Sequence, residues 1–529
     1  MTETLLIRNA EVLDGTGAPA RRADVLVSGG VIEAVEEPGQ IPPEGRTVID
    51  AGGMALAPGF IDVHSHADNA PFLDEDDTSK IMQGVTSEVV GNCGFSLAPR
   101  LSETGPALEA LAARIFPTLP WGWSSFTELL AATDARGYVT NYAPLVGHHA
   151  LRVAVMGMSD GAPDDQQLAA MGDLLDEAMA AGAFGLSSGL IYPPGLFSQT
   201  QELVELAKRL PETRPYVTHM RGEGSQLLAS IAEAVSIGEG AGCRVHISHL
   251  KTAGRSNWGQ MQAALDELDW ARKRGLYVRH DVYPYTAGST MLTAALPPWF
   301  QEGGEPALLR RLNTPADLDR LREQLSRDDG TWENHIYGAG WDGIVVASSA
   351  SHEFDGHSLA QIAATRHVEP FDALVHVLRQ EELKVSMIVH SMQEDDLILA
   401  MRHELTMIGS DGLPPGVGGK PHPRMYGTFP RVLARYSREL SILDLGDAVR
   451  RMTSLPAETF GLHDRGLIAP GKAADLVAFD PASVQDLADY AEPTREPEGI
   501  AWVMVNGEFV VRDGRYLGRR AGRRLVPAT

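Results

Sequence analysis

Six side chains with metal-binding or acid–base chemistry each come at the end of a short apolar run in this sequence. These runs and residues are GFIDVHSH (His64 and His66), TSEVVGNCG (Cys93), PYVTHM (His219), RVHISHL (His249) and LTMIGSDG (Asp411). Imidazole and thiolate are preferred ligands of Zn²⁺, and catalytic zinc sites keep one coordination position open for water. Water held there becomes a nucleophile near neutral pH, and a nearby carboxylate can accept and return its proton. The set therefore predicts a zinc-dependent hydrolytic site.

The spacing of the histidines indicates how they could share one site. His64 and His66 are two residues apart, so on a strand both would point to the same side. His219 and His249 are thirty residues apart, the length of one βαβ unit, which predicts corresponding positions on successive strands. His246 has the opposite parity to His249 and is therefore expected to face the helix layer or solvent.

The chain has two cysteines, and their surroundings differ. Cys93 lies among Gly91, Asn92 and Gly94, where the chain bends and core packing is not indicated. It is therefore interpreted either as a thiolate ligand or as a nucleophile. Cys243 enters a strand amid apolar neighbours and is expected to be a core residue.

The elements that must position these side chains follow a repeating pattern. From about residue 61 to 460, short apolar runs, VSMIVH among them, alternate with amphipathic stretches such as DQQLAAMGDLLDEAMAAG. About eight such units predict an α/β fold, a TIM-like (β/α)8 barrel, with its active site at the carboxyl ends of the strands. The strand-rich segments 1–60 and 461–529 are expected to form one small β-sandwich. The polar, helix-rich segment at about 290–341 is interpreted as an insertion on a barrel loop.

Composition excludes several classes of protein. The 529 residues carry 45 Lys and Arg against 70 Asp and Glu, a net charge of −25, which disfavours nucleic acid and anionic membranes as partners. No stretch approaches the 18 or more apolar residues of a membrane span. Two cysteines argue against a disulfide framework, and MTETLLIRNA has no export-signal pattern. A cytoplasmic protein is therefore expected.

The order of the motifs resembles the D-aminoacylase (N-acyl-D-amino-acid deacylase) family of the amidohydrolase superfamily over nearly the whole chain. The opening APGFIDVHSH and the closing GLIAPGKAADLVAFDP resemble the superfamily, and the motifs closest to the family are GNCGFSLAP, SSGLIYPPG, THMRGEG, SHLKTAG, DVYPYTAGST, GSDGLP and HPRMYGTFPRVL. The resemblance implies zinc-dependent hydrolysis of the amide bond of N-acyl-D-amino acids, small molecules, to a carboxylate and a D-amino acid. The preference for the D isomer rests on this resemblance alone.

The resemblance also implies roles for the six residues. Cys93, His219 and His249 would hold one tightly bound Zn²⁺. A second, weaker metal position would lie at His64 and His66, with Cys93 as the bridge. Asp411 would be the general acid/base for the attack of zinc-bound hydroxide. Many relatives in the superfamily bridge two metals with a carbamylated lysine on the fourth strand, but the matching segment AGAFGLSSGLIY contains no lysine.

Five further residues are expected to bind the substrate carboxylate, because they match positions of the family: Lys251, Arg424, Tyr192, Tyr283 and Ser289. Lys251 is two residues beyond His249, so strand alternation would point it into the same space. Arg424 can offer two parallel N–H donors to a carboxylate. Arg221 and Glu223, which follow His219, could instead form a structural ion pair.

Three alternatives remain at this stage. A hydantoinase- or dihydroorotase-like hydrolase of cyclic amides would share the barrel but would ordinarily use the bridging lysine. A non-catalytic scaffold protein would be free to lose metal ligands, whereas all six residues are present. In a cysteine-nucleophile enzyme, Cys93 would attack the substrate directly. Side-chain and acyl preference, the number of metals and the oligomeric state do not follow from the sequence.

Overall fold

Short parallel strands form the centre of the molecule. The computed structural model describes residues 4–527, and it contains one parallel sheet of three strands and another of six. The three strands are β6 (Phe60–Asp62), β7 (Val85–Val90) and β8 (Asn141–Pro144). The six are β9 (Val146–Gly147), β10 (Leu186–Gly189), β11 (Pro215–His219), β12 (Arg244–Ile247), β13 (Val278–Val282) and β17 (Thr406–Ile408). Almost all of their residues are buried, as expected for parallel strands covered on both faces.

Backbone hydrogen bonds join the two parallel sheets at both edges. At the β8 edge, the N–H of Phe184, two residues before β10, donates to the carbonyl of Pro144 at the end of β8 over 2.7 Å. At the other edge, the Asp411 N–H donates to the carbonyl of His64 over 2.7 Å, and Ser65 forms a parallel bridge with Gly412. The carboxyl ends of the first and last parallel strands therefore meet.

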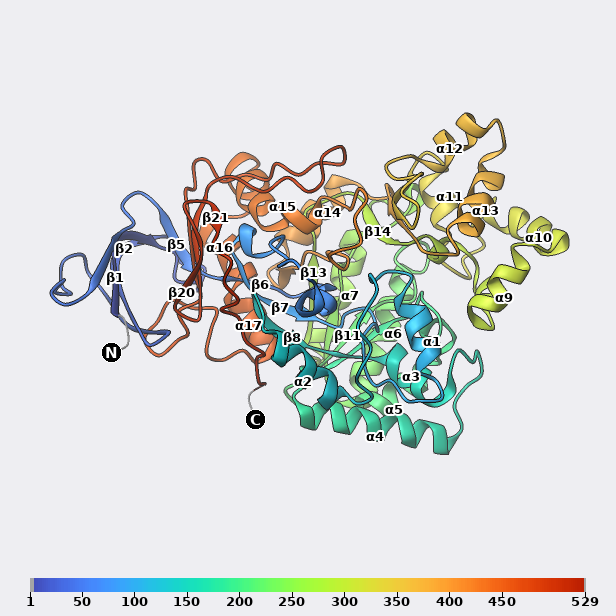
Figure 1. The fold of residues 1–529 in the computed structure, drawn as a ribbon, viewed down its shortest axis with the longest axis horizontal. Helices are drawn as coiled ribbons and strands as arrows, with labels where there is room; N and C mark the ends of the chain where they lie inside the picture. The colour runs from blue at the N-terminus through green and yellow to red at the C-terminus, as the bar shows by residue number, and fades with distance from the viewer. Residues whose placement is uncertain (1–3, 528–529) are drawn as a thin grey trace.

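Amphipathic helices connect and cover these strands, which confirms the predicted mixed α/β class (Figure 1). The expected helix in DQQLAAMGDLLDEAMAAG is α4 (Asp165–Ala181), which begins with a capping box from Asp164 and ends at Gly182, at φ 109°. The other helices around the parallel strands are α1 (Gly105–Ala112), α2 (Phe126–Arg136), α3 (His148–Met156), α5 (Thr200–Ala207), α6 (Leu227–Ala241), α7 (Met261–Lys273), α14 (Glu394–Arg402), α15 (Arg424–Arg431), α16 (Leu445–Met452) and α17 (Ser454–Phe460). Shorter helical segments are η1 (Ala67–Phe72), η2 (Ile81–Gln83), η3 (Gly195–Phe197), η4 (Arg255–Asn257), η5 (Leu292–Ala295) and the π-helical η6 (Val432–Glu439).

The segment between β13 and β17 contains a separate antiparallel sheet. Its strands, in the order β14–β16–β15, are β14 (Gly288–Met291), β15 (Ile344–Ser349) and β16 (Val385–Val389). The helices of this segment are α8 (Pro298–Gln301), α9 (Gly304–Arg311), α10 (Pro315–Leu325), α11 (His335–Ala339), α12 (Leu359–Arg366) and α13 (Pro370–Gln380). The run VSMIVH, expected among the parallel strands, is β16 of this sheet. A short buried apolar run does not reveal its strand partners, so the prediction for this run was wrong.

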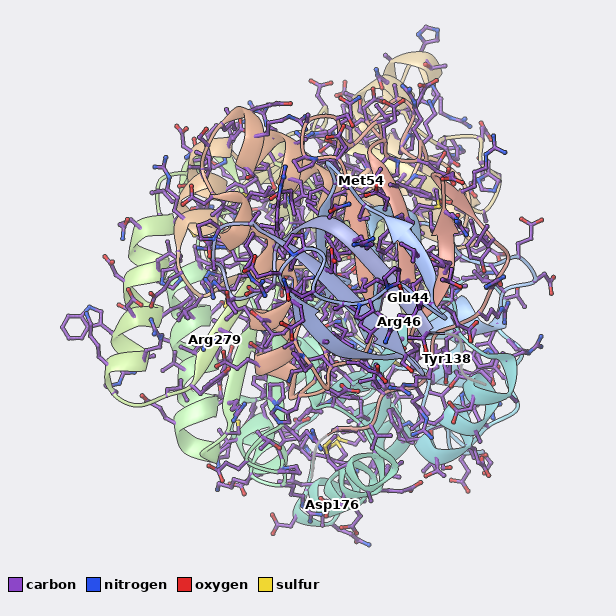
Figure 2. The ribbon with its side chains drawn as sticks, turned by 90° about the vertical axis from the view of Figure 1, so that its left-hand side faces the viewer. Glu44, Arg46, Met54, Tyr138, Asp176 and Arg279 are labelled. Atoms are coloured by element: carbon purple, nitrogen blue, oxygen red, sulfur yellow. The ribbon has the colours of Figure 1, made fainter. Side chains whose placement is uncertain are left out.

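Both ends of the chain contribute to one nine-stranded sheet at the left of Figure 1. Its strands are β1 (Thr4–Val12), β2 (Arg21–Ser28), β3 (Val31–Glu36), β4 (Thr47–Asp50), β5 (Ala55–Pro58), β18 (Leu476–Phe479), β19 (Ile500–Val505), β20 (Glu508–Arg512) and β21 (Arg515–Tyr516). The antiparallel pairing of β18 with β5 joins the two ends of the chain. Figure 2 looks from this side of the molecule, where Arg46 and Met54 are labelled.

Alternating side chains of β18 pack into two different cores. Leu476 and Ala478 belong to the core of the terminal sheet, whereas Val477 and Phe479 pack with residues of the parallel strands and their helices. The sheet is therefore attached through buried apolar side chains. Residues 1–3 and 528–529 of the predicted sandwich lie outside the described residues. Between residues 4 and 527, no helix has the length and apolar character needed to cross a membrane.

Candidate active site

The six residues singled out in the sequence lie at the carboxyl ends of parallel strands. His219 is the last residue of β11, and the others follow the ends of β6, β7, β12 and β17 by two to four residues. Cys93, His249 and Asp411 have positive φ angles of 54°, 39° and 48°. Non-glycine residues rarely adopt this backbone, and three that do so here converge on one site. The tight turns after the strands therefore aim these three side chains.

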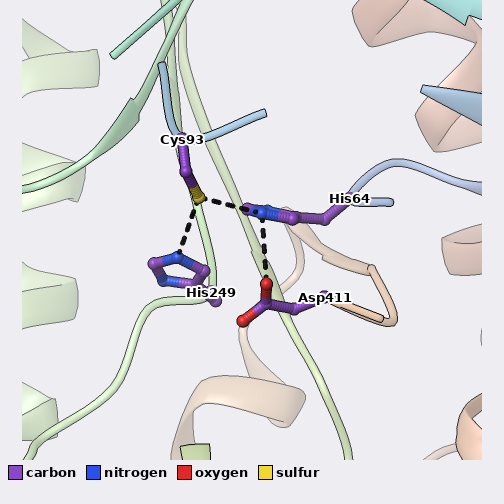
Figure 3. Close-up of side chains that lie close together, drawn as sticks. All are labelled: His64, Cys93, His249 and Asp411. Atoms are coloured by element: carbon purple, nitrogen blue, oxygen red, sulfur yellow. Dashed lines mark hydrogen bonds and ion pairs between the residues drawn. The ribbon is translucent and has the colours of Figure 1, made fainter. Parts of the chain in front are cut away.

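The Cys93 thiol is surrounded by imidazole nitrogens (Figure 3). Its Sγ lies 3.3 Å from Nε2 of His64 and 3.6 Å from Nε2 of His249, both drawn in the figure. Nδ1 of His219 lies 3.8 Å from the same sulfur. Burial alone would raise the pKa of the thiol, but His64 and the hydrogen bonds of the three imidazoles hold it well below its usual value. The sulfur is thus set up as a thiolate, the form that binds metal.

Asp411 joins the two histidines of the His-x-His motif. Its Oδ1 lies 3.5 Å from Nε2 of His64 and 3.3 Å from Nε2 of His66. The strand that was expected to align these histidines ends at Asp62, so alternation along a strand does not explain their proximity. The Arg424 guanidinium forms an ion pair with Oδ2 of Asp411 over 2.9 Å. Burial raises the pKa of Asp411, but Arg424 and His64 outweigh it and hold the pKa well below its usual range.

Glu223 contacts the side of His249 that faces away from the thiol. Its Oε1 lies 2.9 Å from Nδ1 of His249 and accepts a hydrogen bond from Nζ of Lys251 over 2.6 Å. The suggested ion pair between Arg221 and Glu223 was wrong, because Arg221 pairs with Glu233 over 2.9 Å. Nothing in the sequence distinguishes these two glutamates. The preference of a histidine ligand for a carboxylate partner predicts that a glutamate or aspartate lies beside His249, but it does not select Glu223.

Asp281 supports the site from beneath. Its Oδ2 lies 2.6 Å from Nε2 of His246 and 3.6 Å from Nδ1 of His64, and its Oδ1 accepts a hydrogen bond from the His249 N–H. The neighbours of His246, Val245 and Ile247, pack with the helices, whereas His246 is fully buried and points to Asp281, so the expectation that it faces the helix layer or solvent was wrong. That expectation counted alternation through to His249, but β12 ends at Ile247 and the chain turns. Sequence reasoning also missed Asp281, which is the first residue of the motif DVYPYTAGST.

Four of the five residues expected to bind substrate line one cavity, and the fifth, Arg424, is buried and is not among the lining residues. Lys251, Tyr192, Tyr283 and Ser289 line it together with Cys93, His66, His219, His249 and Asp411. Lys251 and Arg424 both lie over the ring of Tyr283, at 5.6 and 4.5 Å from its centre. Arg424 is fixed by the ion pair to Asp411 and by a hydrogen bond from Nη2 to the carbonyl of Ser289. The hydroxyl of Tyr192 contacts that of Thr290 over 2.7 Å.

Two groups of side chains have the donor atoms and proximity that a metal ion requires. In the thiol cluster, formed by His64, Cys93, His249 and Asp411, one donor atom of each residue lies within 4.8 Å of the others. The same holds for the carboxylate cluster of His219, Glu223 and His249. Nε2 of His219 is buried without a hydrogen-bond partner. Thiolate and imidazole donors with a carboxylate orienting one imidazole suit zinc, so the residues present fit this ion.

Comparisons with known proteins agree along almost the entire chain. A profile of the amidohydrolase family matches residues 47–294 and 339–511. D-aminoacylase of Alcaligenes xylosoxydans xylosoxydans is 37% identical over 523 residues, 99% of this chain and 97% of the relative, and the N-acyl-D-aspartate deacylase of that organism is 36% identical over 525 residues, 99% and 95% of the two chains.

A solved structure adds a relative with metal bound. The N-acyl-D-glutamate deacylase of Bordetella bronchiseptica, determined with zinc and a phosphonate inhibitor that mimics the tetrahedral intermediate, is 36% identical, with a TM-score of 0.81 and 99% of both chains covered. A D-aminoacylase crystal structure has a TM-score of 0.82 at 35% identity, again over 99% of both chains. From these matches and the strand-end geometry, the chain belongs to the amidohydrolase family, among its D-aminoacylases.

Proposed function

We propose that this protein hydrolyses the amide bond of N-acyl-D-amino acids in a zinc-dependent reaction and releases a carboxylate and a D-amino acid. The observation that carries the proposal is the convergence of His64, Cys93, His249 and Asp411 within 4.8 Å at the strand ends. Relatives at 36–37% identity over nearly the full chain are named as deacylases of such compounds.

The residues around the thiol would hold the metal. Cys93, His219 and His249 would bind one zinc ion tightly, and His64 and His66 with Cys93 would provide a second, weaker position. The low pKa of the Cys93 thiol supports this role, since metal ligation requires the thiolate. Zinc bound at such a site polarises the acyl carbonyl and lowers the pKa of water.

Asp411 would carry protons between the reactants. Its pKa lies well below the usual range, so the carboxylate is ionised at neutral pH and can accept a proton from the attacking water. It would pass this proton to the amide nitrogen as the C–N bond breaks, which yields the acyl carboxylate and the free amine. Asp411→Asn is expected to lower kcat by about 10²–10⁴-fold while zinc content is unchanged.

The substrate carboxylate would be bound by Lys251, Arg424, Tyr192, Tyr283 and Ser289. Lys251 and Arg424 place two cations at the Tyr283 ring, close to the reacting groups. The Ser289 hydroxyl is buried without a hydrogen-bond partner, so it is available to a ligand. A cationic wall of this kind binds an anionic substrate and fixes its orientation.

We also propose that the two parallel sheets form one (β/α)8 barrel over residues 61–460, because hydrogen bonds join them at both edges. Residues 1–60 and 461–529 would form a second domain, a β-sandwich, and the segment at about 290–341 would belong to an insertion. The low cysteine content and net charge of −25 favour a cytoplasmic enzyme without nucleic acid or membrane partners.

The test is a paired assay of N-acetyl-D- and N-acetyl-L-methionine, with zinc measured on the same sample. Amine release from the D isomer alone, with about one zinc per chain, is the expected result. Retained zinc with neither isomer cleaved would contradict the substrate and direct the search to cyclic amides. Dihydropyrimidinase is similar in fold, with a TM-score of 0.56 at 16% identity. Absence of both metal and activity would contradict the mechanism.

A further inference from the structure

A second and larger cavity adjoins the candidate active site. It has a volume of about 880 Å³, within the range of small-molecule binding pockets. Its walls come from the segment after α1, the end of β15 and the loop that follows Asp411. Ile115 and Leu413 line both this cavity and the one that contains Cys93 and Asp411, so the two spaces meet at these side chains.

Arg114 in the wall of this cavity is a buried cation without a direct partner. The residue is 6% exposed, and within residues 4–527 its side chain has no hydrogen bond or ion pair; its Nε is buried and unpaired. Other buried arginines of this protein are paired, Arg152 with Glu202 and Arg424 with Asp411. A buried charge without a partner is costly, so Arg114 has the character of a group that receives an anionic ligand.

The other charged groups of the cavity leave room for an anion. Glu109 already forms an ion pair with Arg100. Burial lowers the pKa of Arg114, and the negative charge of Glu305 raises it. Glu305 is therefore near the guanidinium, but it does not form an ion pair with it. Lys384 is an exposed second cation in the wall. The two positive charges of Arg114 and Lys384 therefore outnumber the one negative charge of the cavity wall that has no ion pair within residues 4–527, that of Glu305.

Apolar side chains line the place where the two cavities adjoin. Leu413 follows Asp411 by two residues and lines both cavities with Ile115, so an acyl group that extends past these two side chains would enter the second cavity. From there Ile115, Phe116 and Pro414 continue along the cavity wall. Methylene groups of an acyl chain would pack against these side chains, and a carboxylate at the far end would reach the guanidinium of Arg114.

We propose that this cavity binds the acyl group of the substrate and that Arg114 binds a carboxylate at the end of that group. The preferred substrates are then N-acyl-D-amino acids whose acyl chain derives from a dicarboxylic acid. The inference rests on the proposed function and extends it, since it assigns the chemical class of the acyl group.

The test compares acyl groups that are matched in length and differ in terminal charge. The substrates are N-succinyl-, N-glutaryl- and N-adipoyl-D-methionine, each against the butanoyl, pentanoyl or hexanoyl compound with the same number of carbons. For at least one length, kcat/KM of the dicarboxylic compound is expected to exceed that of its neutral counterpart by about tenfold or more.

Substitution of Arg114 should remove this preference. In Arg114→Met the ratio of the two kcat/KM values is expected to fall to about one, while Arg114→Lys retains part of it. Both substrates are measured on the same sample, so any loss of folded enzyme cancels in the ratio. Arg209→Met is the matched control, because Arg209 pairs with Asp173 and Asp176 away from the cavity and its loss leaves the ratio unchanged.

Three results would overturn the inference. The first is a ratio near one at every length in the wild-type enzyme, and the second is a high ratio that persists in Arg114→Met. The third is Arg114-dependent binding of free glutarate without any preference among substrates, which would assign the cavity to a free carboxylate. If neither the acetyl nor the longer compounds are cleaved, the proposed function fails, and calorimetric binding of N-glutaryl-D-methionine to wild type and Arg114→Met then tests the cavity by itself.

Discussion

The thiol cluster and the carboxylate cluster share His249, but their other members have different contacts. In the thiol cluster, Sγ of Cys93 faces Nε2 of His64 and Nε2 of His249, and Asp411 pairs with Arg424 through Oδ2 while its Oδ1 stays directed at His64. In the carboxylate cluster, Glu223 already contacts both Lys251 and Nδ1 of His249. The first cluster therefore leaves its donors for an ion, whereas the second orients one of those donors. A carboxylate that fixes a histidine ligand in this way is common around zinc.

Removal of the thiol should have the largest effect. Cys93→Ser is expected to abolish zinc retention and hydrolysis together, because a neutral serine hydroxyl cannot replace the thiolate as a metal ligand. Metal content after gel filtration and amine release measure the two effects. Cys243→Ser, at a buried cysteine outside both clusters, is the control and should retain zinc. Full zinc content in inactive Cys93→Ser would instead favour Cys93 as a nucleophile.

The affinity of the metal-free protein for zinc should rise with pH. Burial and Lys251 lower the pKa of His249, but Glu223 and Asp411 raise it, and the resulting pKa is about 9. Because zinc binds the neutral imidazole, the proton competes below this pH, so affinity should increase by about tenfold per unit from pH 7 and level off above pH 9. Competition with a chelator at each pH measures this, and a flat profile would contradict it.

Loss of the orienting carboxylate should cost less than loss of a ligand. Glu223→Gln is expected to weaken zinc binding or activity by about 10–100-fold, since His249 loses the charged partner of its Nδ1. The same substitution at Glu233, which pairs with Arg221, is the matched control. Equal effects at the two positions would show that Glu223 acts only through packing.

The strand ends could be located from the sequence, because each catalytic candidate follows an apolar run and a buried parallel strand is such a run. Contacts between segments were located poorly. The sequence of β16 is typical of a buried parallel strand, but β16 pairs with β14 and β15 in the antiparallel sheet. Burial determines the apolar composition of a strand, whichever strands lie beside it. His246 was misplaced because the turn with positive φ at His249 changes the direction of the side chains, and Glu223 because no local pattern reveals its contact with His249. A local sequence pattern predicts which residues are buried and where a strand lies. It does not predict which distant segment the strand or side chain contacts.

The smallest effect is expected at the edge of the carboxylate cluster. The Tyr192 ring packs edge-on against His219, with centres 5.0 Å apart, and its hydroxyl contacts Thr290 over 2.7 Å. Tyr192→Phe keeps the ring and removes one hydrogen bond, so KM should rise by about 2- to 10-fold while zinc content stays the same. Tyr216→Phe, which removes a hydroxyl bonded to Ser188 outside the cavity, is the control. A fall in zinc content in Tyr192→Phe would contradict a role in substrate binding alone. It would mean that the hydroxyl helps to hold His219, and Tyr192 would then be counted among the residues that support a metal ligand.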